Sequence, residues 1–356
     1  MRVLITGCDG YIGPVMARVL LADGHDVCGT DTNYFDNCGF VGDIPEFPRI
    51  HADIRDFPAR ALVGVEAVVH LAALSNDPMG DLKDDWTWDI NIAATARLAR
   101  LAKDAGVKRF VYASSCSIYG ASGGDDRMDE TAPVAPITPY AISKVRCEAE
   151  LSKLAGSDFS PTYMRNATAY GVSPRLRTDL VLNNLVAWAC TTGKVNILSD
   201  GTAWRPIVNI VDISRAVAAV LAAPRDKIHD QPFNVGRDEE NFRVRDIAEI
   251  VRRAVPGSEV AFGGAGSPDL RSYQVSFAKY GRAFPDRPLV CTAEDGAREL
   301  YQAFTATRMT EERFQSRDYV RLKQLKHLIA EDALDAHLRW RAARDAAAAV
   351  PAPARS

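Results

Sequence analysis

The sequence predicts an α/β fold, in which a doubly wound parallel sheet is joined to a smaller α+β lobe. Two observations predict this fold. The first half of the chain alternates short apolar, β-branched runs with helical stretches, which is typical of a parallel sheet with helices on both faces. After about residue 172 the pattern changes to short strands, proline-containing turns and separate helices, which indicates an additional lobe of mixed structure.

The elements of the first half follow one another in regular order. We expect strands over residues 2–6, 25–30, 67–71 and 109–114, and helices over residues 12–23, 88–105 and 140–155. In the lobe, we expect helices over residues 180–192 and 244–255. Gly24 and Gly106 directly follow two of the helices, in the position where glycine commonly ends a helix. Pro139 precedes a third, where proline commonly begins one.

The domain boundaries follow from the same pattern. We assign residues 1–172 to the first domain, and we expect the apolar segment at about 207–222 to return to it. Residues 173–206 and 223–340 then form the smaller lobe and its C-terminal helices. The last residues, 341–356, are mostly Ala, Pro and Arg and have little to bury, so we expect a disordered tail.

Composition and charge exclude several classes of protein. The 356 residues are 47% hydrophobic and 25% charged, and the net charge of −3 gives no general attraction to nucleic acid or to an anionic membrane. No run approaches the ~18 apolar residues of a membrane span. The seven cysteines are scattered, form no C-x-x-C pair and have no histidine cluster nearby. We therefore expect a reduced, cytoplasmic protein without a bound metal.

A glycine-rich turn lies between the first predicted strand and the first predicted helix. Gly7, Gly10 and Gly13 form G-x-x-G-x-x-G. In this context the first glycine permits a tight turn, the second lets backbone N–H groups approach a pyrophosphate, and the third lets the helix pack closely on the strand. The positive end of the helix dipole then faces the phosphates. The alternative is a glycine-rich turn that binds nothing.

Asp31 ends the second predicted strand, 18 residues after Gly13. A carboxylate at this position accepts hydrogen bonds from the adenosine ribose hydroxyls and repels a 2′-phosphate. No Arg or Lys occurs in the next four residues, which favours NAD over NADP. The alternative is an exposed aspartate at a turn.

Tyr140 and Lys144 are four residues apart at the start of a predicted helix, so their side chains lie on one face. A lysine ammonium stabilises a neighbouring phenolate and lowers its pKa from about 10. Such a tyrosinate is a general base for a sugar hydroxyl. By itself the spacing also fits an ordinary surface pair.

A second polar group supports the catalytic interpretation. The sequence SSCSIYG, which includes Ser115, directly follows the strand predicted over residues 109–114. Its hydroxyl groups therefore lie at the carboxyl end of that strand, and in open α/β sheets this edge is the ligand crevice.

Taken in order, the motifs TGCDGYIG, Asp31, Asp53–Ile54, HLAALS, SSCSIYG, YAISK and RPIVNIVDI are highly specific. The chain resembles the extended short-chain dehydrogenase/reductase family over about residues 1–290, in particular its NAD-dependent nucleotide-sugar epimerases and dehydratases. The resemblance implies a Rossmann-type NAD-binding domain and a substrate-binding lobe. It also implies a homodimer formed through the helices at about 88–105 and 140–155.

The family implies roles for matching positions. Asn91 would lie in the helix behind the site, and Ser115 would hydrogen-bond the reacting hydroxyl beside Tyr140. The catalytic residues would be Ser115, Tyr140 and Lys144. The NAD-binding residues would be Gly7, Gly10, Tyr11, Ile12, Gly13, Asp31, Asp53, Ile54, Leu71, Ala72, Ala73, Tyr140 and Lys144, with Asp53 and Ile54 at the adenine. The substrate-binding residues would be Ser75, Cys116, Ser117, Asn166, Thr168, Asn184, Leu185, Arg205 and Arg271, with Arg205 at the pyrophosphate.

The sequence departs from the family pattern at two places. The family often has R-x-x-N-x-Y-G after the sixth strand, but here Thr168 takes the Asn position and Asn166 is displaced by two residues. Either residue is a candidate for the sugar contact. The sugar dehydratases carry an acidic residue in the catalytic loop, whereas this chain has Cys116 and Ser117. Cys116 is either a packed small residue or a reactive thiol.

The resemblance to a family rich in epimerases, together with the missing acidic residue, favours an NAD-dependent nucleotide-sugar epimerase that acts at C4 through a transient 4-keto sugar. The alternatives are a 4-dehydrogenase or 4-ketoreductase with net NAD(H) turnover, a 4,6-dehydratase and a non-catalytic NAD-binding protein. Residues 294–340 exceed the usual family C-terminus, and we expect them to pack as helices on the smaller lobe or at an interface.

Overall fold

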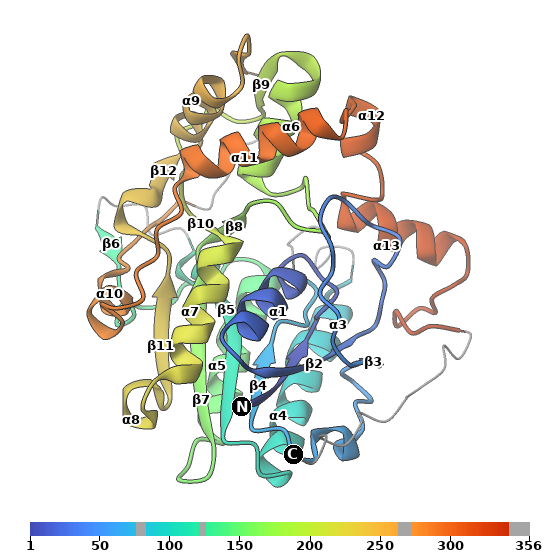
Figure 1. Ribbon diagram of the computed structural model, residues 1–356, viewed down its shortest axis with the longest axis vertical. Helices are drawn as coiled ribbons and strands as arrows, with labels where there is room; N and C mark the ends of the chain where they lie inside the picture. Colours follow the sequence, from blue (N-terminus) through green and yellow to red (C-terminus); the bar gives the residue numbers. More distant parts are fainter. Residues whose placement is uncertain (76–82, 121–125, 263–271, 342–356) are drawn as a thin grey trace.

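A seven-stranded, wholly parallel sheet forms the larger lobe (Figure 1). The computed structural model describes residues 1–75, 83–120, 126–262 and 272–341. The strands lie in the order β11-β7-β5-β4-β1-β2-β3. Their bounds are β1 (Arg2–Thr6), β2 (Asp26–Asp31), β3 (Arg49–His51), β4 (Ala67–His70), β5 (Arg109–Ser115), β7 (Ser160–Asn166) and β11 (Gln231–Val235). The strand order reverses between β1 and β4, and such a switch point opens the ligand crevice of an α/β sheet.

Helices cover both faces of the sheet, as the sequence predicts. Val3 and Ile5 of β1 pack in one core with α1 (Gly13–Ala22) and α7 (Ile210–Ala222). The intervening Leu4 packs in a second core with α4 (Ala94–Asp104) and α5 (Pro139–Ser152). Because successive side chains point to opposite faces, a strand buried on both sides is apolar throughout.

The helix predicted over residues 88–105 is interrupted. It consists of α3 (Asp84–Thr87), the π-helical stretch η2 (Trp88–Ala93) and α4. A π-helical stretch carries one extra residue per turn and is frequent at functional sites. Here it contains Asn91, whose contacts are described below.

The smaller lobe combines short strands with packed helices. Its strands are β8 (Thr168–Tyr170), β10 (Trp204–Asn209) and β12 (Asn241–Arg243) in one sheet, and β9 (Lys194–Ile197) with β13 (Glu259–Phe262) in another. Its helices α6 (Val181–Thr192) and α9 (Val244–Ala254) lie where they are predicted. The remaining short elements are η1 (Ala59–Leu62), η3 (Cys116–Tyr119), β6 (Arg127–Met128), α8 (Arg225–Ile228), η4 (Asp238–Glu240), β14 (Gln274–Val275) and α10 (Ala278–Ala283).

The boundary of the first domain needs a correction. Strand β11 falls in the range 223–340 that we assigned to the smaller lobe, yet it pairs with β7 as the seventh strand of the large sheet. Its Phe233 and Val235 are fully buried in the core beneath α7. The return to the first domain therefore extends to Val235, because the sheet needs this strand to cover the edge of β7.

The C-terminal region packs on both lobes. Helices α11 (Ala293–Ala306) and α12 (Glu311–Phe314) pack on the smaller lobe, as expected. In contrast, α13 (Arg321–Ala330) and the residues up to 341 lie against the first domain, where they share a hydrophobic cluster with Tyr34 and Ile54. Residues 342–356, for which we expected disorder, lie outside the described residues.

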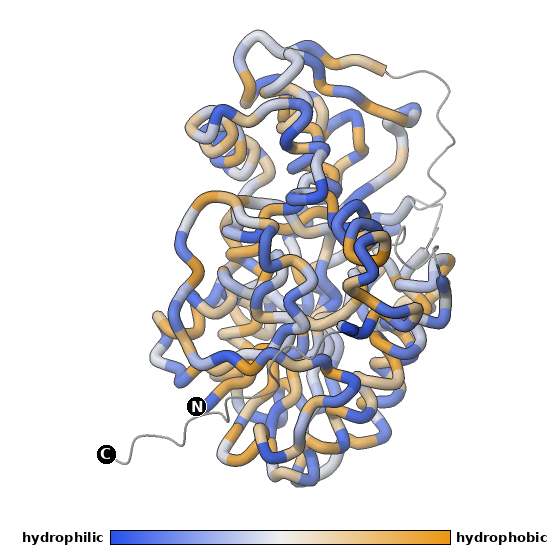
Figure 2. Tube along the Cα trace, turned by 90° about the vertical axis from the view of Figure 1, so that its right-hand side faces the viewer, coloured by the Kyte–Doolittle hydropathy of each residue, from blue (hydrophilic) through white to orange (hydrophobic). Residues whose placement is uncertain are grey.

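Short hydrophobic and hydrophilic stretches alternate along the trace in both lobes (Figure 2). Within the described ranges, no helix is both long and apolar enough to cross a membrane.

Candidate active site

The glycine turn after β1 is built for close backbone approach. Gly7 has φ +71°, and a Cβ added there would lie 2.8 Å from the backbone nitrogen of Ala72. A Cβ on Gly13 would lie 2.2 Å from the carbonyl oxygen of Cys8. Only glycine fits both positions, and the turn leads directly into the N-terminus of α1. This cradle fits the pyrophosphate of a dinucleotide.

Asp31 lies at the end of β2, beside the glycine turn. Its carboxylate accepts hydrogen bonds from the backbone N–H groups of Asp9 at 3.1 Å and Asn33 at 2.9 Å. Burial raises the pKa of Asp31 to about 6. An oriented, half-buried carboxylate in this position fits the ribose hydroxyls of an adenosine group.

The loop after β4 lies at the carboxyl end of the strand next to β1. Leu71, Ala72 and Ala73 are half-buried, and Ser75 is exposed. The Asn91 side chain holds this loop, because it accepts from the backbone N–H of Leu74 at 2.8 Å and donates to its carbonyl oxygen at 3.0 Å. Asn91 thus joins η2 to the loop after β4, and its place behind the site stays a prediction.

Helix α5 carries Tyr140 and Lys144 beside the carboxyl end of β5. Thr138 caps the helix, since its hydroxyl oxygen accepts from the backbone N–H of Ala141 at 3.2 Å. The Lys144 ammonium lies 5.3 Å from the centroid of the Tyr140 ring and donates to the carbonyl oxygen of Ala113 at 2.6 Å. Burial lowers the pKa of Lys144 to about 8. The predicted pair is therefore a buried ammonium close to a half-buried phenol.

A buried ion pair fixes α5 to the sheet. Glu148, one turn after Lys144, accepts from the Ser114 hydroxyl at 2.5 Å and from Nη2 of Arg165 at 2.7 Å. These contacts join α5 to β5 and β7. Mutual orientation of this kind preorganises a catalytic group.

The catalytic loop begins at Ser115. Its hydroxyl oxygen accepts from the backbone N–H of Ser117 at 3.1 Å. Cys116 is fully buried, its thiol donates to the carbonyl oxygen of Arg165 at 3.0 Å, and burial raises its pKa well above the usual range. Cys116 is therefore a packed residue, and our expectation that it contacts substrate is corrected because its side chain has no exposed surface.

Two buried oxygen atoms near this loop have no hydrogen-bond partner among the described residues. They are the Ser117 hydroxyl and the amide oxygen of Asn166. Asn166 lies opposite Ser115 in the pairing of β5 with β7, whereas Thr168 begins β8. Buried polar atoms without partners are unusual and mark places where a ligand supplies the missing contact. Both Asn166 and Thr168 remain candidates for a sugar contact.

The substrate residues predicted in the lobe already have protein partners. Asn184 donates to the carbonyl oxygen of Thr178 at 2.8 Å, and Arg205 donates to that of Trp204 at 2.7 Å. Leu185 is buried in the core of the lobe. Their roles toward a nucleotide stay predictions, and Arg271 lies outside the described residues.

Sequence reasoning missed Arg177. Its guanidinium is buried, pairs with Asp179 at 2.9 Å and donates to the Ser75 hydroxyl at 3.0 Å. It thus joins the smaller lobe to the loop that follows β4. The only signal in the sequence is the close spacing of Arg177 and Asp179 before a predicted helix, and this spacing does not point to Ser75.

His70 is a structural residue. Its ring lies between the hydroxyls of Thr6 at 2.6 Å and Thr95 at 2.7 Å, and burial lowers its pKa to about 3. Over the part of the chain that the structure describes, no three His, Cys, Asp or Glu side chains are arranged to hold a metal ion.

The fold and the site together define a class of protein. A glycine turn at the switch point, an aspartate at the end of the second strand and the Tyr140–Lys144 pair beside β5 are an arrangement that fits a dinucleotide-dependent enzyme. The chain matches the NAD dependent epimerase/dehydratase family over residues 3–236 and belongs to it. The predictions of the extended short-chain dehydrogenase/reductase family, the Rossmann-type fold and the NAD cofactor are thereby confirmed.

The relatives include proteins named as epimerases and a protein named as a dehydratase. The chain is 30% identical to UDP-glucuronate 4-epimerase of Thermodesulfobacterium geofontis over 71% of this chain and 80% of the relative. It is 30% identical to UDP-glucose 4-epimerase of Mycolicibacterium smegmatis over 84% and 97%. It is 25% identical to dTDP-D-glucose 4,6-dehydratase of Mus musculus over 70% and 72%.

Solved structures similar to this chain also include NAD complexes. MoeE5, in complex with UDP-glucuronic acid and NAD, superposes with a TM-score of 0.74 at 25% identity and covers 86% of this chain and 100% of its own. DesIV, a dTDP-glucose 4,6-dehydratase from Streptomyces venezuelae with NAD bound, has a TM-score of 0.74 at 26% identity, with 86% and 98% covered. This chain is thus longer than its structural neighbours.

Proposed function

We propose that the protein is a nucleotide-sugar 4-epimerase that acts through a transient 4-keto sugar. The observation that carries the proposal is the buried Lys144 ammonium beside Tyr140, close to a catalytic loop that contains no carboxylic acid. Relatives named as 4-epimerases of UDP-glucose and UDP-glucuronate support the same reaction.

The side chains supply the proton transfers of this reaction. NAD, when bound, supplies the chemistry of accepting and returning a hydride. Tyr140, as a phenolate, removes the proton of the 4-hydroxyl, and Ser115 orients that hydroxyl through a hydrogen bond. The positive charge of Lys144 stabilises the phenolate. After the keto sugar presents its other face, Tyr140 returns the proton to the new hydroxyl.

The catalytic loop argues against a dehydratase. Elimination of water needs a group that protonates the departing hydroxyl. Cys116 is fully buried with a raised pKa, and Ser117 carries a hydroxyl group in place of a carboxylic acid. Neither supplies the proton near neutral pH.

A 4-dehydrogenase or 4-ketoreductase is the second candidate, because it would use the same Ser115, Tyr140 and Lys144. The two reactions differ in net redox change. An epimerase leaves the amounts of NAD⁺ and NADH unchanged, whereas a dehydrogenase or reductase consumes one of them in each turnover.

The deciding experiment is to incubate the purified protein, without added cofactor, with UDP-, dTDP-, GDP-, ADP- and CDP-sugars and to follow the products by NMR. We expect a stereoisomer at C4 without net NADH formation. Turnover that occurs only with excess NAD⁺ or NADH would assign a one-way dehydrogenase or reductase instead. A 4-keto-6-deoxy product would assign a dehydratase.

We further propose a cytoplasmic homodimer. All seven cysteines are free, as a reducing compartment would leave them. Trp88 of η2 is 43% exposed and lies beneath Arg146 of α5 at 5.4 Å, which places an apolar group on the helices expected at the dimer contact. Light scattering on the purified protein tests the dimer, and a monomeric mass would contradict it.

A further inference from the structure

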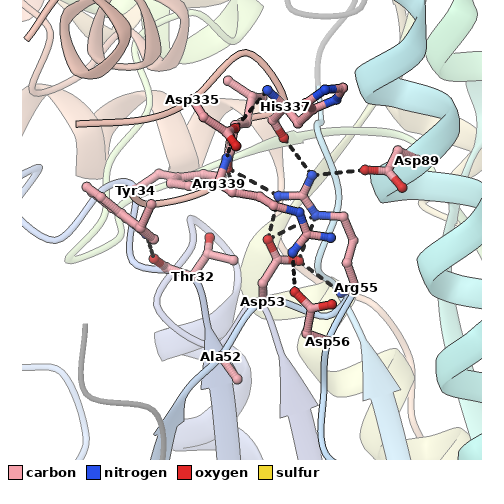
Figure 3. Close-up of polar contacts among 12 residues, drawn as sticks. Thr32, Tyr34, Ala52, Asp53, Arg55, Asp56, Asp89, Asp335, His337 and Arg339 are labelled. Carbon is pink, nitrogen blue, oxygen red and sulfur yellow. Dashed lines mark hydrogen bonds and ion pairs between the residues drawn. The ribbon is translucent and has the colours of Figure 1, made fainter. Parts of the chain in front are cut away.

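Residues 331–341, here called the clasp, fold back from the C-terminal region onto the first domain (Figure 3). After α13 the chain turns at Asp332, which has φ +54°. A bridge between Leu334 and Trp340 then closes a short loop. The Asp335 carboxylate accepts from the backbone N–H of Arg339 at 2.8 Å and holds the loop in shape.

The clasp is anchored by apolar side chains. Leu334 is 2% exposed and Leu338 is fully buried. They share one hydrophobic cluster with Tyr34 and Ile54, and Ala72 packs against it. Ile54 and Ala72 are two of the residues that we expect to contact NAD, so the clasp shares its core with the wall of the predicted cofactor site.

Arg55 ties the clasp to the predicted adenine border. Its Nε and Nη2 donate to the Asp53 carboxylate at 3.0 and 2.5 Å. Its Nη1 and Nη2 also donate to the carbonyl oxygens of His337 at 2.6 Å and Leu338 at 3.2 Å (Figure 3). The Arg55 side chain is only 3% exposed. A buried charge that loses hydrogen-bond partners is costly, so this contact opposes opening of the clasp.

The clasp also holds the residues that directly follow Asp31. The indole N–H of Trp340 donates to the carbonyl oxygen of Thr32 at 2.7 Å. The Tyr34 hydroxyl donates to the carbonyl oxygen of Leu338, and an ion pair joins Arg339 to Asp56. The clasp therefore contacts both segments, after β2 and after β3, between which an adenosine group is expected.

We propose that the clasp forms the outer wall of the adenosine end of the NAD site and that its opening limits release of the cofactor. This inference rests on the proposed placement of NAD along Asp31 and Asp53. It adds a function for a segment beyond residue 236, where the match to the family ends. A cofactor regenerated in each cycle has no need to leave, and a closed clasp suits that use.

Release of NADH tests the proposal without any sugar turnover. Full-length protein is loaded with NADH and mixed with excess NAD⁺, and the loss of bound-NADH fluorescence gives the release rate. Leu338→Ala removes the buried anchor of the clasp, and we expect release about ten-fold faster than in the wild type, equivalent to about 1.4 kcal/mol. His337→Ala is the matched control, because this neighbouring side chain is exposed.

The possible outcomes distinguish opening of the clasp from other causes of faster NADH release. Equal release rates for Leu338→Ala and His337→Ala would overturn the proposal. If Leu338→Ala fails to fold, Trp340→Phe, which removes one donor and keeps an aromatic ring, decides by itself: faster release supports the clasp and an unchanged rate overturns it. A wild-type chain that holds neither NADH nor co-purified NAD⁺ would contradict the cofactor placement, whereas failure of the sugar assay alone would leave this measurement intact.

Discussion

Lys144 is the residue whose surroundings bear most directly on the chemistry. Burial disfavours its charged form and lowers its pKa to about 8, although Cys147 and Glu148 act in the opposite direction. An ammonium with this pKa is charged near neutral pH and becomes neutral as the pH rises through about 8. The charge of Lys144 therefore stabilises the Tyr140 phenolate mainly at pH values below about 8.

The pH profile should show this limit. We expect kcat/KM to fall as the pH rises through about 8, approaching about ten-fold per pH unit as the charged fraction declines. Lys144→Arg keeps its charge at all these pH values, so this variant should be slower overall but lack the alkaline fall. A wild-type profile that stays level to pH 9.5 would contradict the assignment.

Tyr140 is the proposed general base. Tyr140→Phe should reduce kcat by about 10²–10⁴ with an unchanged melting temperature, because the phenyl ring keeps the packing and loses only the ionisable hydroxyl. Tyr301→Phe, on α11 of the smaller lobe, is the matched control and should keep full activity. Product formation followed by NMR measures both. Activity of Tyr140→Phe at the control level would remove Tyr140 from the mechanism.

For individual residues, the sequence predicts a contact when the two residues are close along the chain. Tyr140 and Lys144 are one helical turn apart, and that spacing predicts their proximity. Arg177 and Ser75 lie 102 residues apart and meet only through the packing of two lobes, so no spacing predicts their hydrogen bond. Burial of Cys116 was also undecided, because a small residue in a loop has no periodic pattern.

Among the elements, the β1–turn–α1 unit depends most on backbone geometry. Gly13→Ala would place a Cβ 2.2 Å from a backbone oxygen that cannot move without shifting the turn. We expect a loss of about 2–4 kcal/mol in the free energy of unfolding, with weaker NAD binding. Gly281→Ala, in α10, meets no atom within 4 Å and is the control. It should change stability by less than about 1 kcal/mol.

Urea unfolding of the two variants measures this difference. Equal midpoints would show that the turn at Gly13 yields more easily than its geometry indicates.

The element order of this unit was predictable because strand, glycines and helix are contiguous. The π-helical stretch η2 was not, because a shift from one backbone hydrogen-bond pattern to another leaves the apolar pattern of residues 88–105 nearly unchanged.

For the whole molecule, Tyr11 links the two lobes. Tyr11 lies in the glycine turn, between Gly10 and Gly13. Its hydroxyl donates to the carbonyl oxygen of Gly171 at 2.7 Å and accepts from the Asn183 amide at 3.0 Å. All three residues are buried. A motif residue predicted to contact NAD thus also connects the glycine turn of the first domain to Asn183 of α6 in the smaller lobe.

Tyr11→Phe should therefore weaken the association of the lobes. We expect a loss of about 1–3 kcal/mol in the free energy of unfolding, because the Gly171 carbonyl and the Asn183 amide lose a buried partner. Thermal unfolding measures the change, and Tyr301→Phe again serves as the control. A melting temperature equal to that of the control would show that water or another group replaces the hydroxyl.

The large sheet could be predicted because its strands alternate with helices along the chain. The position of α13 and the clasp could not, because Leu338 meets Tyr34 across a separation of 304 residues and no local pattern records such a contact. The apolar residues of α13 predict a buried face but do not say which lobe covers it.

The ribosome makes the clasp long after it has made the segments that the clasp contacts. Arg55 and its acceptor Leu338 are separated by 283 residues, so translation at a typical rate takes ~15–60 s to pass from one to the other. During that interval the nascent chain has its first three strands but not the segment that covers them. On the proposed placement of NAD, the adenosine end of the site therefore stays open until residues 331–341 have been made.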